Sequence, residues 1–192
     1  MTTHNKIIVI CGTSGSGKGS VIRGLMGNKK LNLYWAKTAT TRTPRPDDSK
    51  TSRRIFLSRD EFEKLWRDGE IIERNVYNGA LYGALKSEIE KYPKRTVIVE
   101  TDINGALALK EYYGKNCLTI FLLVTPRDTE RRLRKRGMPD NVISTRLKIA
   151  QKEIEMRKLC DKVIVNREGK LEQAIAEVTR HIRGFWRPNE VT

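Results

Sequence analysis

A short segment near the start of the chain has the residue types and spacing of a phosphate-binding loop. It reads Gly12-Thr13-Ser14-Gly15-Ser16-Gly17-Lys18-Gly19-Ser20, which fits the spacing Gly-x-x-x-x-Gly-Lys. Glycines let the backbone curl so that its N–H groups point at phosphate oxygens, and a helix that follows adds its positive N-terminal end. A lysine at the position of Lys18 reaches the β- and γ-phosphates. The segment therefore predicts binding of a nucleoside triphosphate together with Mg²⁺.

One position of this loop departs from the usual motif. Gly19 follows the lysine, where a serine or threonine normally ligates Mg²⁺, so Ser20 is the candidate hydroxyl for a contact through water. A Gly/Ser-rich surface turn has a similar composition, but a strand-like run before the segment and a helix-like run after it favour the phosphate loop. The chain has no Asn-Lys-x-Asp segment, which a GTPase would need to read its base, and a helicase would be much longer.

Two arginines about twenty residues beyond the loop form a second candidate anion site. Arg42 and Arg45 flank Thr43-Pro44, whose proline stiffens the chain between them. Paired guanidinium groups suit bidentate capture of a phosphate. Taken alone, the pattern is equally compatible with a solvated turn that exposes two arginines.

The elements that would position these residues follow a β–α rhythm. Four short apolar runs rich in β-branched residues predict the strands of a buried parallel sheet, at residues 6–10, 96–99, 118–124 and 162–165. Apolar residues at helical spacing predict the intervening helices, at residues 18–26, 103–112, 140–159 and 171–182. This alternation predicts a doubly wound α/β domain with a three-layer arrangement.

Two stretches interrupt that rhythm and are expected to lie over the carboxyl edge of the sheet, where open α/β sheets bind ligands. Residues 38–94 are rich in Arg, Thr and Pro, and contain two short strand candidates, 54–57 and 71–76, around a helix from Ser58. Ser58 and Glu61 have the spacing of a capping box. Residues 127–147 begin with a run of arginines. We therefore expect one domain over residues 4–186, with a core of 4–37, 95–126 and 148–186 and two subdomains.

The order of motifs along the chain resembles the guanylate kinase family over almost its whole length. The motifs are Gly-x-Ser-Gly-x-Gly-Lys, Thr-Thr-Arg-x-Pro-Arg, Phe-x-Ser-x-x-Glu-Phe, Tyr-Gly, Asp-x-x-Gly and Arg-Gly. Residues 40–45 are the most specific piece, and residues 78–83 support it. The resemblance implies an ATP-dependent nucleoside-monophosphate kinase of the P-loop fold, with a monophosphate-binding subdomain (38–94) and an Arg-rich lid (127–147).

The resemblance also implies a role for individual residues. The acceptor nucleotide would be bound by Thr38, Arg42, Arg45, Arg54, Glu73, Tyr82, Ala84, Glu100, Asp102 and Arg146. Within that set, Arg42, Arg45, Arg54 and Tyr82 would hold the phosphate, and Glu73 would pair with the guanine edge. Besides the loop from Gly12 to Ser20, ATP would contact Arg132, Arg136 and Asn166. Lys18, Arg42, Arg136 and Arg146 would be the catalytic cations, and Mg²⁺ would be held by the ATP phosphates and water near Ser20, Glu100 and Asp102.

Four positions depart from the family pattern. Arg54 stands where the family has a phosphate-binding tyrosine, Ala84 replaces a serine that helps read guanine, Glu100 replaces an aspartate, and Leu81 replaces an aromatic residue. Phosphate binding is thus expected to be kept or strengthened, because an arginine replaces the tyrosine, while the base-reading residues are altered. We expect GMP or dGMP as the acceptor. The alternatives are another deoxy or modified nucleoside monophosphate, or a sugar phosphate such as ribose 1,5-bisphosphate, although the latter has no need for a guanine-pairing acid.

Composition agrees with a protein that binds anions. The 192 residues include 38 Lys or Arg and 23 Asp or Glu, which gives a formal net charge of +15. No apolar run is long enough for a membrane span, and the absence of a signal-peptide core predicts a cytoplasmic protein. The three cysteines, Cys11, Cys117 and Cys160, are odd in number and scattered, so we expect neither a disulfide framework nor a zinc site. With only two histidines, histidine metal clusters are also not expected.

Two further functions compete with the kinase. Guanylate-kinase-like domains also serve as non-catalytic protein-binding modules, but these typically lose the ATP loop, which is present here. The charge, with Phe185 and Trp186 between arginines, would suit stacking on a nucleic-acid base. We instead expect this aromatic pair to pack on the core, with no nucleic-acid partner. We expect a monomer or a homodimer.

Overall fold

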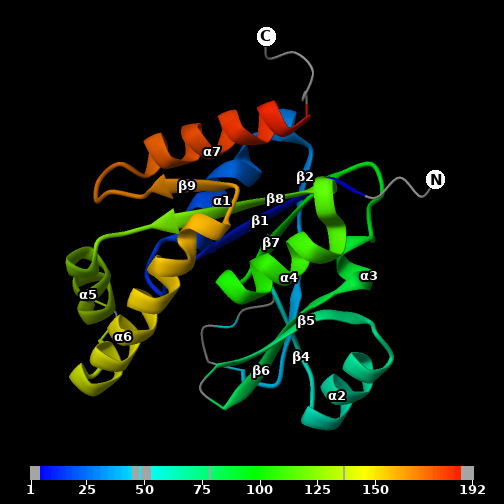
Figure 1. Cartoon of the computed structure of the whole chain (residues 1–192), viewed down its shortest axis with the longest axis horizontal. Helices are drawn as coiled ribbons and strands as arrows, with labels where there is room; N and C mark the ends of the chain where they lie inside the picture. The colour runs from blue at the N-terminus through cyan, green and yellow to red at the C-terminus, as the bar shows by residue number, and fades with distance from the viewer. Residues whose placement is uncertain (1–4, 45–47, 49–52, 78, 136, 187–192) are drawn as a thin grey trace.

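The computed structural model describes residues 5–44, 48, 53–77, 79–135 and 137–186. Its centre is a sheet of five parallel strands in the order β2-β7-β1-β8-β9 (Figure 1). The strands are β1 (Ile7–Gly12), β2 (Leu33–Trp35), β7 (Thr96–Glu100), β8 (Cys117–Leu123) and β9 (Lys162–Val165). The predicted α/β class with a parallel sheet is therefore confirmed. The sequence analysis did not predict β2, because three residues are too few to show a periodicity.

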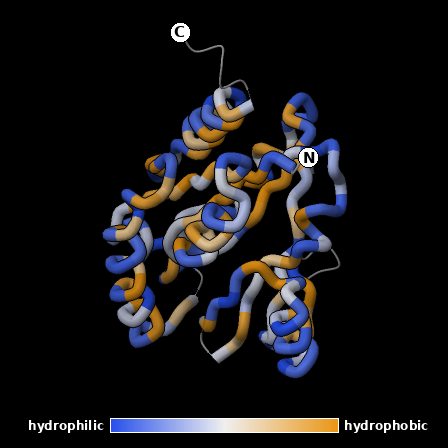
Figure 2. The backbone as a smooth tube through the Cα atoms, turned by 45° about the vertical axis from the view of Figure 1, so that its right-hand side comes forward, coloured by the Kyte–Doolittle hydropathy of each residue, from blue (hydrophilic) through white to orange (hydrophobic). Residues whose placement is uncertain are grey.

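The side chains of β1 alternate between the two faces of this sheet. Ile8 and Ile10 pack with residues of α1 (Lys18–Gly27) and α7 (Leu171–Trp186), whereas Ile7 and Val9 pack with residues of α4 (Ile103–Tyr113). The molecule thus has a helix–sheet–helix arrangement of three layers (Figure 1). Figure 2 shows hydrophobic residues concentrated along the central strands, while the outer helices alternate between hydrophobic and hydrophilic residues.

β9 lies at the edge of the sheet and is less buried than its apolar sequence suggests. Only Ile164 is fully buried, and the side chains of Val163 and Val165 on the other face are exposed. The reason is topological, since β9 has a neighbour, β8, on one side only. A run of four residues with three β-branched side chains does not distinguish a central strand from an edge strand.

A second, smaller sheet is built from the residues that interrupt the β–α rhythm. Its strand order is β4-β3-β6-β5, with β3 and β4 parallel and the other pairs antiparallel. The strands are β3 (Thr38–Thr40), β4 (Arg54–Phe56), β5 (Ile71–Tyr77) and β6 (Ala80–Leu85). α2 (Arg59–Arg67) covers it, and its Phe62 is fully buried against Ile71 and Leu81. The predicted capping box of Ser58 and Glu61 at the start of α2 is confirmed.

One buried carboxylate ties together the two places where the chain passes between the sheets. Glu88, in α3 (Lys86–Ile89), accepts a hydrogen bond from the Tyr34 hydroxyl and one from the Lys37 backbone N–H at 3.1 Å. Lys91 forms an ion pair with the other oxygen at 2.8 Å. Tyr34 and Lys37 belong to the outgoing connection, whereas Glu88 and Lys91 belong to the returning one. Glu88 therefore closes the neck between the two sheets.

Two helices after β8 form the region predicted as a lid. They are α5 (Pro126–Lys135) and α6 (Asp140–Met156), which pack on each other. The Thr125 hydroxyl accepts a hydrogen bond from the Asp128 N–H at 3.1 Å and so caps α5. The helix predicted at 140–159 ends earlier, and its last turn is the 3₁₀ turn η3 (Arg157–Leu159). In Figure 1 the α5–α6 pair and the small sheet both lie below the central sheet, on opposite sides of the view.

The aromatic pair at the end of α7 packs on the core, as predicted. Phe185 and Trp186 are partly buried against the cluster on the α1–α7 face. The Trp186 Nε1–H donates to Thr96 Oγ1 at 3.0 Å, and Lys6 Nζ donates to the Phe185 carbonyl at 2.7 Å. In the part of the chain that the structure describes, no helix is long and apolar enough to cross a bilayer.

The core of the small sheet gives a stability prediction. Replacing Phe62 with alanine removes a fully buried ring and should lower the free energy of unfolding by about 3–5 kcal/mol. The matched control is Arg67→Ala in the exposed surface of the same helix, which should stay within about 0.5 kcal/mol of wild type. Urea unfolding followed by circular dichroism measures both. Equal unfolding midpoints for the two variants would contradict the burial of Phe62.

Candidate active site

The phosphate loop connects the end of β1 to the start of α1 and has a backbone that needs glycine. Gly17 has φ +88°, and a Cβ there would lie 2.5 Å from the amide nitrogen of Asn166. The Ser16 N–H donates to the Thr13 carbonyl at 3.1 Å and closes a turn inside the loop. Thr13 and Ser16 are completely buried. The loop is therefore packed into the protein, unlike a free surface turn.

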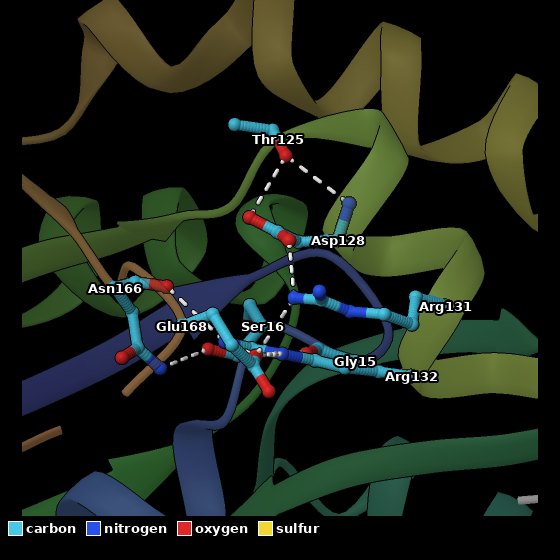
Figure 3. Close-up of polar contacts among 8 residues, drawn as sticks. All are labelled: Gly15, Ser16, Thr125, Asp128, Arg131, Arg132, Asn166 and Glu168. Atoms are coloured by element: carbon cyan, nitrogen blue, oxygen red, sulfur yellow. Dashed lines mark hydrogen bonds and ion pairs between the residues drawn. The ribbon is translucent and has the colours of Figure 1, made fainter. Parts of the chain in front are cut away.

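Three side chains from distant elements hold this loop in place. Asn166 Nδ2 donates to the Ser16 carbonyl at 2.7 Å, and Arg132 donates to the Gly15 carbonyl at 3.1 Å (Figure 3). Arg146, from α6, donates to Ser14 Oγ at 2.7 Å. The three were predicted as nucleotide ligands, and the structure brings all of them to the loop. Each of the three donates a hydrogen bond to a group of the loop itself.

Glu168 connects the lid region to the core beside the loop. Its carboxylate lies between two arginines of α5, with N···O distances of 3.3 Å to Arg131 and 3.1 Å to Arg132 (Figure 3). Because Glu168 follows β9, this contact joins α5 to the edge of the central sheet. The Arg132 guanidinium is thereby aligned along the loop.

Lys18 folds back onto the loop. Its ammonium donates to the Gly12 carbonyl at 2.6 Å and to the Thr13 carbonyl at 3.2 Å. These bonds hold the positive charge of Lys18 at the first two residues of the loop. The side chain lines a cavity, so it faces the space where the phosphates of a nucleotide are expected.

That cavity has a volume of about 270 Å³ and lies between the phosphate loop, the small sheet and α6. It brings together ten of the predicted site residues: Gly12, Ser14, Lys18, Thr38, Arg54, Glu73, Tyr82, Glu100, Asp102 and Arg146. Gly83, Thr101 and Glu153 also line it and were missed by the sequence analysis. All three had a readable signal, since Gly83 belongs to the Tyr-Gly motif, Thr101 lies between the two predicted acids and Glu153 lies two helical turns after Arg146.

Glu73 is the most unusual group in the cavity. It lies in an irregular stretch of β5, where the register with β6 shifts between Ile71 and Arg74, and such bulges redirect side chains. Its side chain is buried, with Oε1 accepting a hydrogen bond from the Thr101 hydroxyl at 3.2 Å. Oε2 has no hydrogen-bond partner among the described residues. A buried carboxylate oxygen left without a donor is costly, so the site has an acceptor to offer to a ligand.

Two glycines leave room for Glu73, one beside its backbone carbonyl and one beside its carboxyl group. A Cβ at Gly83 would lie 2.7 Å from the Glu73 carbonyl oxygen, and a Cβ at Gly105 would lie 3.0 Å from the Glu73 carboxyl carbon. Gly83 belongs to the Tyr-Gly motif and Gly105 to the Asp-x-x-Gly motif. Both motifs therefore serve the placement of Glu73.

The surroundings of Glu73 favour its neutral form. Burial raises the pKa of the Glu73 carboxyl to about 8, and repulsion from Asp102 acts in the same direction. The Thr101 hydrogen bond and the charge of Arg54 lower this pKa without offsetting burial. A strongly shifted acid in a cavity is typical of functional sites.

One basic and one aromatic side chain, Arg54 and Tyr82, lie at the small-sheet side of the cavity. Arg54 donates to the Thr38 hydroxyl, its register partner across β3 and β4. The Arg54 guanidinium also lies 6.0 Å from the centre of the Tyr82 ring. Although Arg54 departs from the family pattern, its guanidinium lines the cavity beside the predicted phosphate ligand Tyr82.

Carboxylates gather on the opposite side. Glu100 ends β7, and Asp102 caps α4 by accepting from the Gly105 N–H at 2.9 Å. Burial raises the pKa of Glu153 to about 7, while the charge of Lys18 lowers it. The described residues contain no group of three or more acidic, histidine or cysteine side chains arranged to hold a metal. A metal held here by three or more ligands would therefore take some of them from outside these side chains.

A second cavity, of about 510 Å³, opens on the other side of the phosphate loop. Its lining includes Gly15, Gly17, Ser20, Arg132 and Asn166. The two cavities thus flank the loop, one toward the small sheet and one toward β9 and α5. Ser20 lies in this second cavity, with its hydroxyl accepting from Arg23 at 3.3 Å, and so does not share a cavity with Glu100 and Asp102.

Two further predicted residues are not part of the first cavity. Arg42 forms an ion pair with Asp48 at 2.8 Å and lies 5.3 Å from the Phe56 ring, so its guanidinium already has an anionic partner. Ala84, the register partner of Thr38, is buried in the core and does not line the cavity. Arg45 and Arg136 lie outside the described residues. Gly19, at the start of α1, lines neither of the two cavities described here.

Comparison with known proteins agrees with this arrangement. The family model described as guanylate kinase matches residues 4–184. The chain is 36% identical over 185 residues to the guanylate kinase of Porphyromonas gingivalis, covering 94% of this chain and 97% of that protein. The guanylate kinase of Bacteroides fragilis is 35% identical over 189 residues, covering 96% and 91%. The chain belongs to the guanylate kinase family.

One solved structure is similar to this chain in its fold. The crystal structure of guanylate kinase from Anaplasma phagocytophilum matches with a TM-score of 0.72 and 24% sequence identity, covering 94% of this chain and 85% of that one. The family resemblance stated from the motifs is therefore confirmed, as is the P-loop kinase fold.

The buried acid gives a pH prediction. Because Glu73 in the folded protein keeps its proton up to pH about 8, the native state binds more protons than the unfolded state above pH ~4.5, and stability falls as the pH rises through this window. Glu73→Gln removes this titrating group. Between pH 5 and 9, the free energy of unfolding of the variant should therefore fall by about 4 kcal/mol less than that of the wild type. Urea unfolding of both proteins at the two pH values measures the difference. Parallel pH curves would show that Glu73 ionises normally.

Proposed function

We propose that this chain transfers the γ-phosphoryl group of ATP to GMP or dGMP, giving ADP and the nucleoside diphosphate. The observation that carries this proposal is Glu73, a buried carboxyl group with one oxygen that has no partner among the described residues. Guanine presents two adjacent donors, N1–H and the exocyclic amine, which fit the two oxygens of a carboxylate. Membership of the guanylate kinase family supports the same acceptor.

In this proposal the small sheet binds the acceptor. Glu73 and Thr38 would lie at the base, and Arg54 and Tyr82 would hold the phosphate from the same cavity. Arg42 and Arg45 would complete the phosphate site, with Arg42 exchanging its ion pair with Asp48 for one with the phosphate. Residues 38–94 would thus act as the monophosphate-binding subdomain, and residues 127–147 as the lid.

The phosphate loop would bind the donor. Its backbone N–H groups and Lys18 would bind the β- and γ-phosphates, once the ammonium exchanges the Gly12 and Thr13 carbonyls for phosphate oxygens. Arg132 and Asn166 would line the adenosine side in the second cavity. Arg136 would join Arg132 at the lid and add positive charge near the triphosphate.

Transfer itself needs alignment and charge neutralisation more than a general base. Arg146 reaches the loop from α6 and also lines the 270 Å³ cavity, which in this proposal is the acceptor cavity. From there its guanidinium would stabilise charge between donor and acceptor. Mg²⁺ would be held by the ATP phosphates and by water near Glu100 and Asp102, where it would neutralise the phosphate oxygens. These carboxylates fit such a contact because they line the same cavity as Lys18.

Two alternatives fit the site less well. A sugar phosphate such as ribose 1,5-bisphosphate carries no base, and it would leave the unpaired oxygen of Glu73 buried without a donor. A non-catalytic binding module would have no use for a loop anchored by Asn166, Arg132 and Arg146. Another nucleoside monophosphate remains the main competitor, because Ala84 offers no polar group for reading the base.

The decisive experiment measures ADP formation from Mg-ATP across a panel of ribo- and deoxynucleoside monophosphates. We expect GMP and dGMP to give the highest kcat/KM. Lys18→Ala should lower turnover about a thousandfold, since it removes a positioned cation, whereas the exposed control Lys30→Ala should leave turnover unchanged. If folded protein binds ATP but no monophosphate stimulates turnover, the kinase proposal fails.

A second experiment addresses the base. Glu73→Gln keeps the shape of the side chain but replaces one acceptor with a donor, so KM for GMP should rise about 10–100-fold while KM for ATP stays within about twofold. KM for GMP in the wild type should also fall as the pH rises towards 8, because the ionised carboxyl is the form that accepts two hydrogen bonds. An unchanged substrate profile in the variant would exclude Glu73 as the base reader.

A further inference from the structure

Two cysteines from opposite ends of the chain meet beneath the phosphate loop. Cys11 is fully buried on β1, directly before Gly12, and Cys160 is partly buried between η3 and β9. Their sulfur atoms lie 3.6 Å apart, although 149 residues separate them in the sequence. The sequence analysis described the cysteines as scattered, but the parallel pairing of β1, β8 and β9 brings these two together.

The surroundings shift the pKa values of the two thiols in opposite directions. The hydrogen bond between the two thiols lowers the pKa of Cys160, against the opposing effect of burial, and a hydrogen bond with Thr119 lowers this pKa as well. Accordingly the pKa of Cys11 is raised, by the hydrogen bond to Cys160 and by its own burial. Burial raises the pKa of the third cysteine, Cys117, to about 12. Cys160 is the more accessible of the two thiols and the one whose pKa is lowered, and both properties favour it as the attacking sulfur.

We propose that Cys11 and Cys160 are a redox-reactive dithiol that takes a low-molecular-weight disulfide as its oxidant. The sulfurs need to approach by only roughly 1.5 Å to reach the length of a disulfide bond. Cys117 lies outside the pair, with no comparable sulfur contact among the described residues. This site goes beyond the proposed kinase function and does not depend on it.

The reaction proceeds in two exchanges that balance. The Cys160 thiolate attacks one sulfur of the small disulfide RSSR, forming Cys160–S–S–R and releasing RS⁻. The Cys11 thiol then gives its proton to RS⁻, and its sulfur attacks Cys160 Sγ, forming the Cys11–Cys160 bond and releasing the second RS⁻, which takes up from water the proton that Cys160 had released. Two protein thiols are oxidised, and RSSR is reduced to two thiols.

The position of the bond links it to the phosphate loop. Cys11 is held in a central strand that pairs on both sides, so the Cys160 side must supply the movement. Cys160 follows the η3 turn that ends α6, and α6 carries Arg146 and Glu153 into the acceptor cavity. Forming the bond therefore pulls the end of α6 toward the base of the loop, and it restrains the two parts relative to each other.

The chemistry is tested on the full chain with oxidised glutathione as the probe. After incubation, free thiols are alkylated under denaturing conditions and the digested peptides are analysed by mass spectrometry. We expect a linked pair of peptides containing Cys11 and Cys160, with Cys117 fully alkylated. Glutathione retained on Cys160 with no link to Cys11, or no reaction at either residue in protein that stays folded, would overturn the proposal.

The coupling to the site is tested by binding of Mg-ATP and by turnover, before and after reduction with dithiothreitol. Oxidation should lower both by about tenfold, which is a usual size for coupling between distinct sites, and reduction should restore them. Cys117→Ser should behave like wild type, whereas Cys160→Ser should keep full binding and turnover in the presence of the oxidant. A linked protein that binds Mg-ATP as well as the reduced protein would show that the bond does not act on the loop.

Discussion

The whole molecule is organised around one constraint, which is to hold a glycine-rich turn in a single shape. Glycine has more backbone freedom to lose than any other residue, so the loop between β1 and α1 cannot keep its form unaided. Arg132, Arg146 and Asn166 supply the missing bonds, from α5, α6 and the end of β9. These elements follow β8 in the chain, so the first motif in the sequence is shaped by the last third of it.

A second constraint is the burial of Glu73. An acid that is neutral when folded costs stability at neutral and higher pH, and the packing of Phe62, Ile71 and Leu81 around the small sheet must offset this cost. The space for Glu73 comes from Gly83, beside its backbone carbonyl, and from Gly105, beside its carboxyl group, and neither glycine has a side chain that packs. This part of the structure is therefore arranged for binding at the expense of stability, as strained or destabilised features at functional sites usually are.

Residues close in sequence could be predicted together, and residues joined by tertiary contacts could not. The loop from Gly12 to Ser20 and the capping box of Ser58 depend on local spacing, and the predicted phosphate loop and cap are found where expected. Glu153 contributes to the site only because α6 brings it to the cavity beside the phosphate loop. Arg42 forms an ion pair with Asp48, and no periodicity in the sequence predicts that contact. The short strands β2 and β3 lack enough residues to display a pattern, and the meeting of Cys11 with Cys160 follows from strand order, which a single sequence does not specify.

The neck closed by Glu88 has a consequence for how the protein unfolds. One carboxylate with an exposed fraction of 7% bonds both connections between the two sheets, so neither sheet can loosen without giving up bonds that the other also uses. Regions that share such bonds tend to open together as one cooperative unit. The small sheet should therefore not unfold independently of the central sheet. Local opening near the cavity that Glu73 lines should weaken the contacts of Tyr34 in β2 of the central sheet.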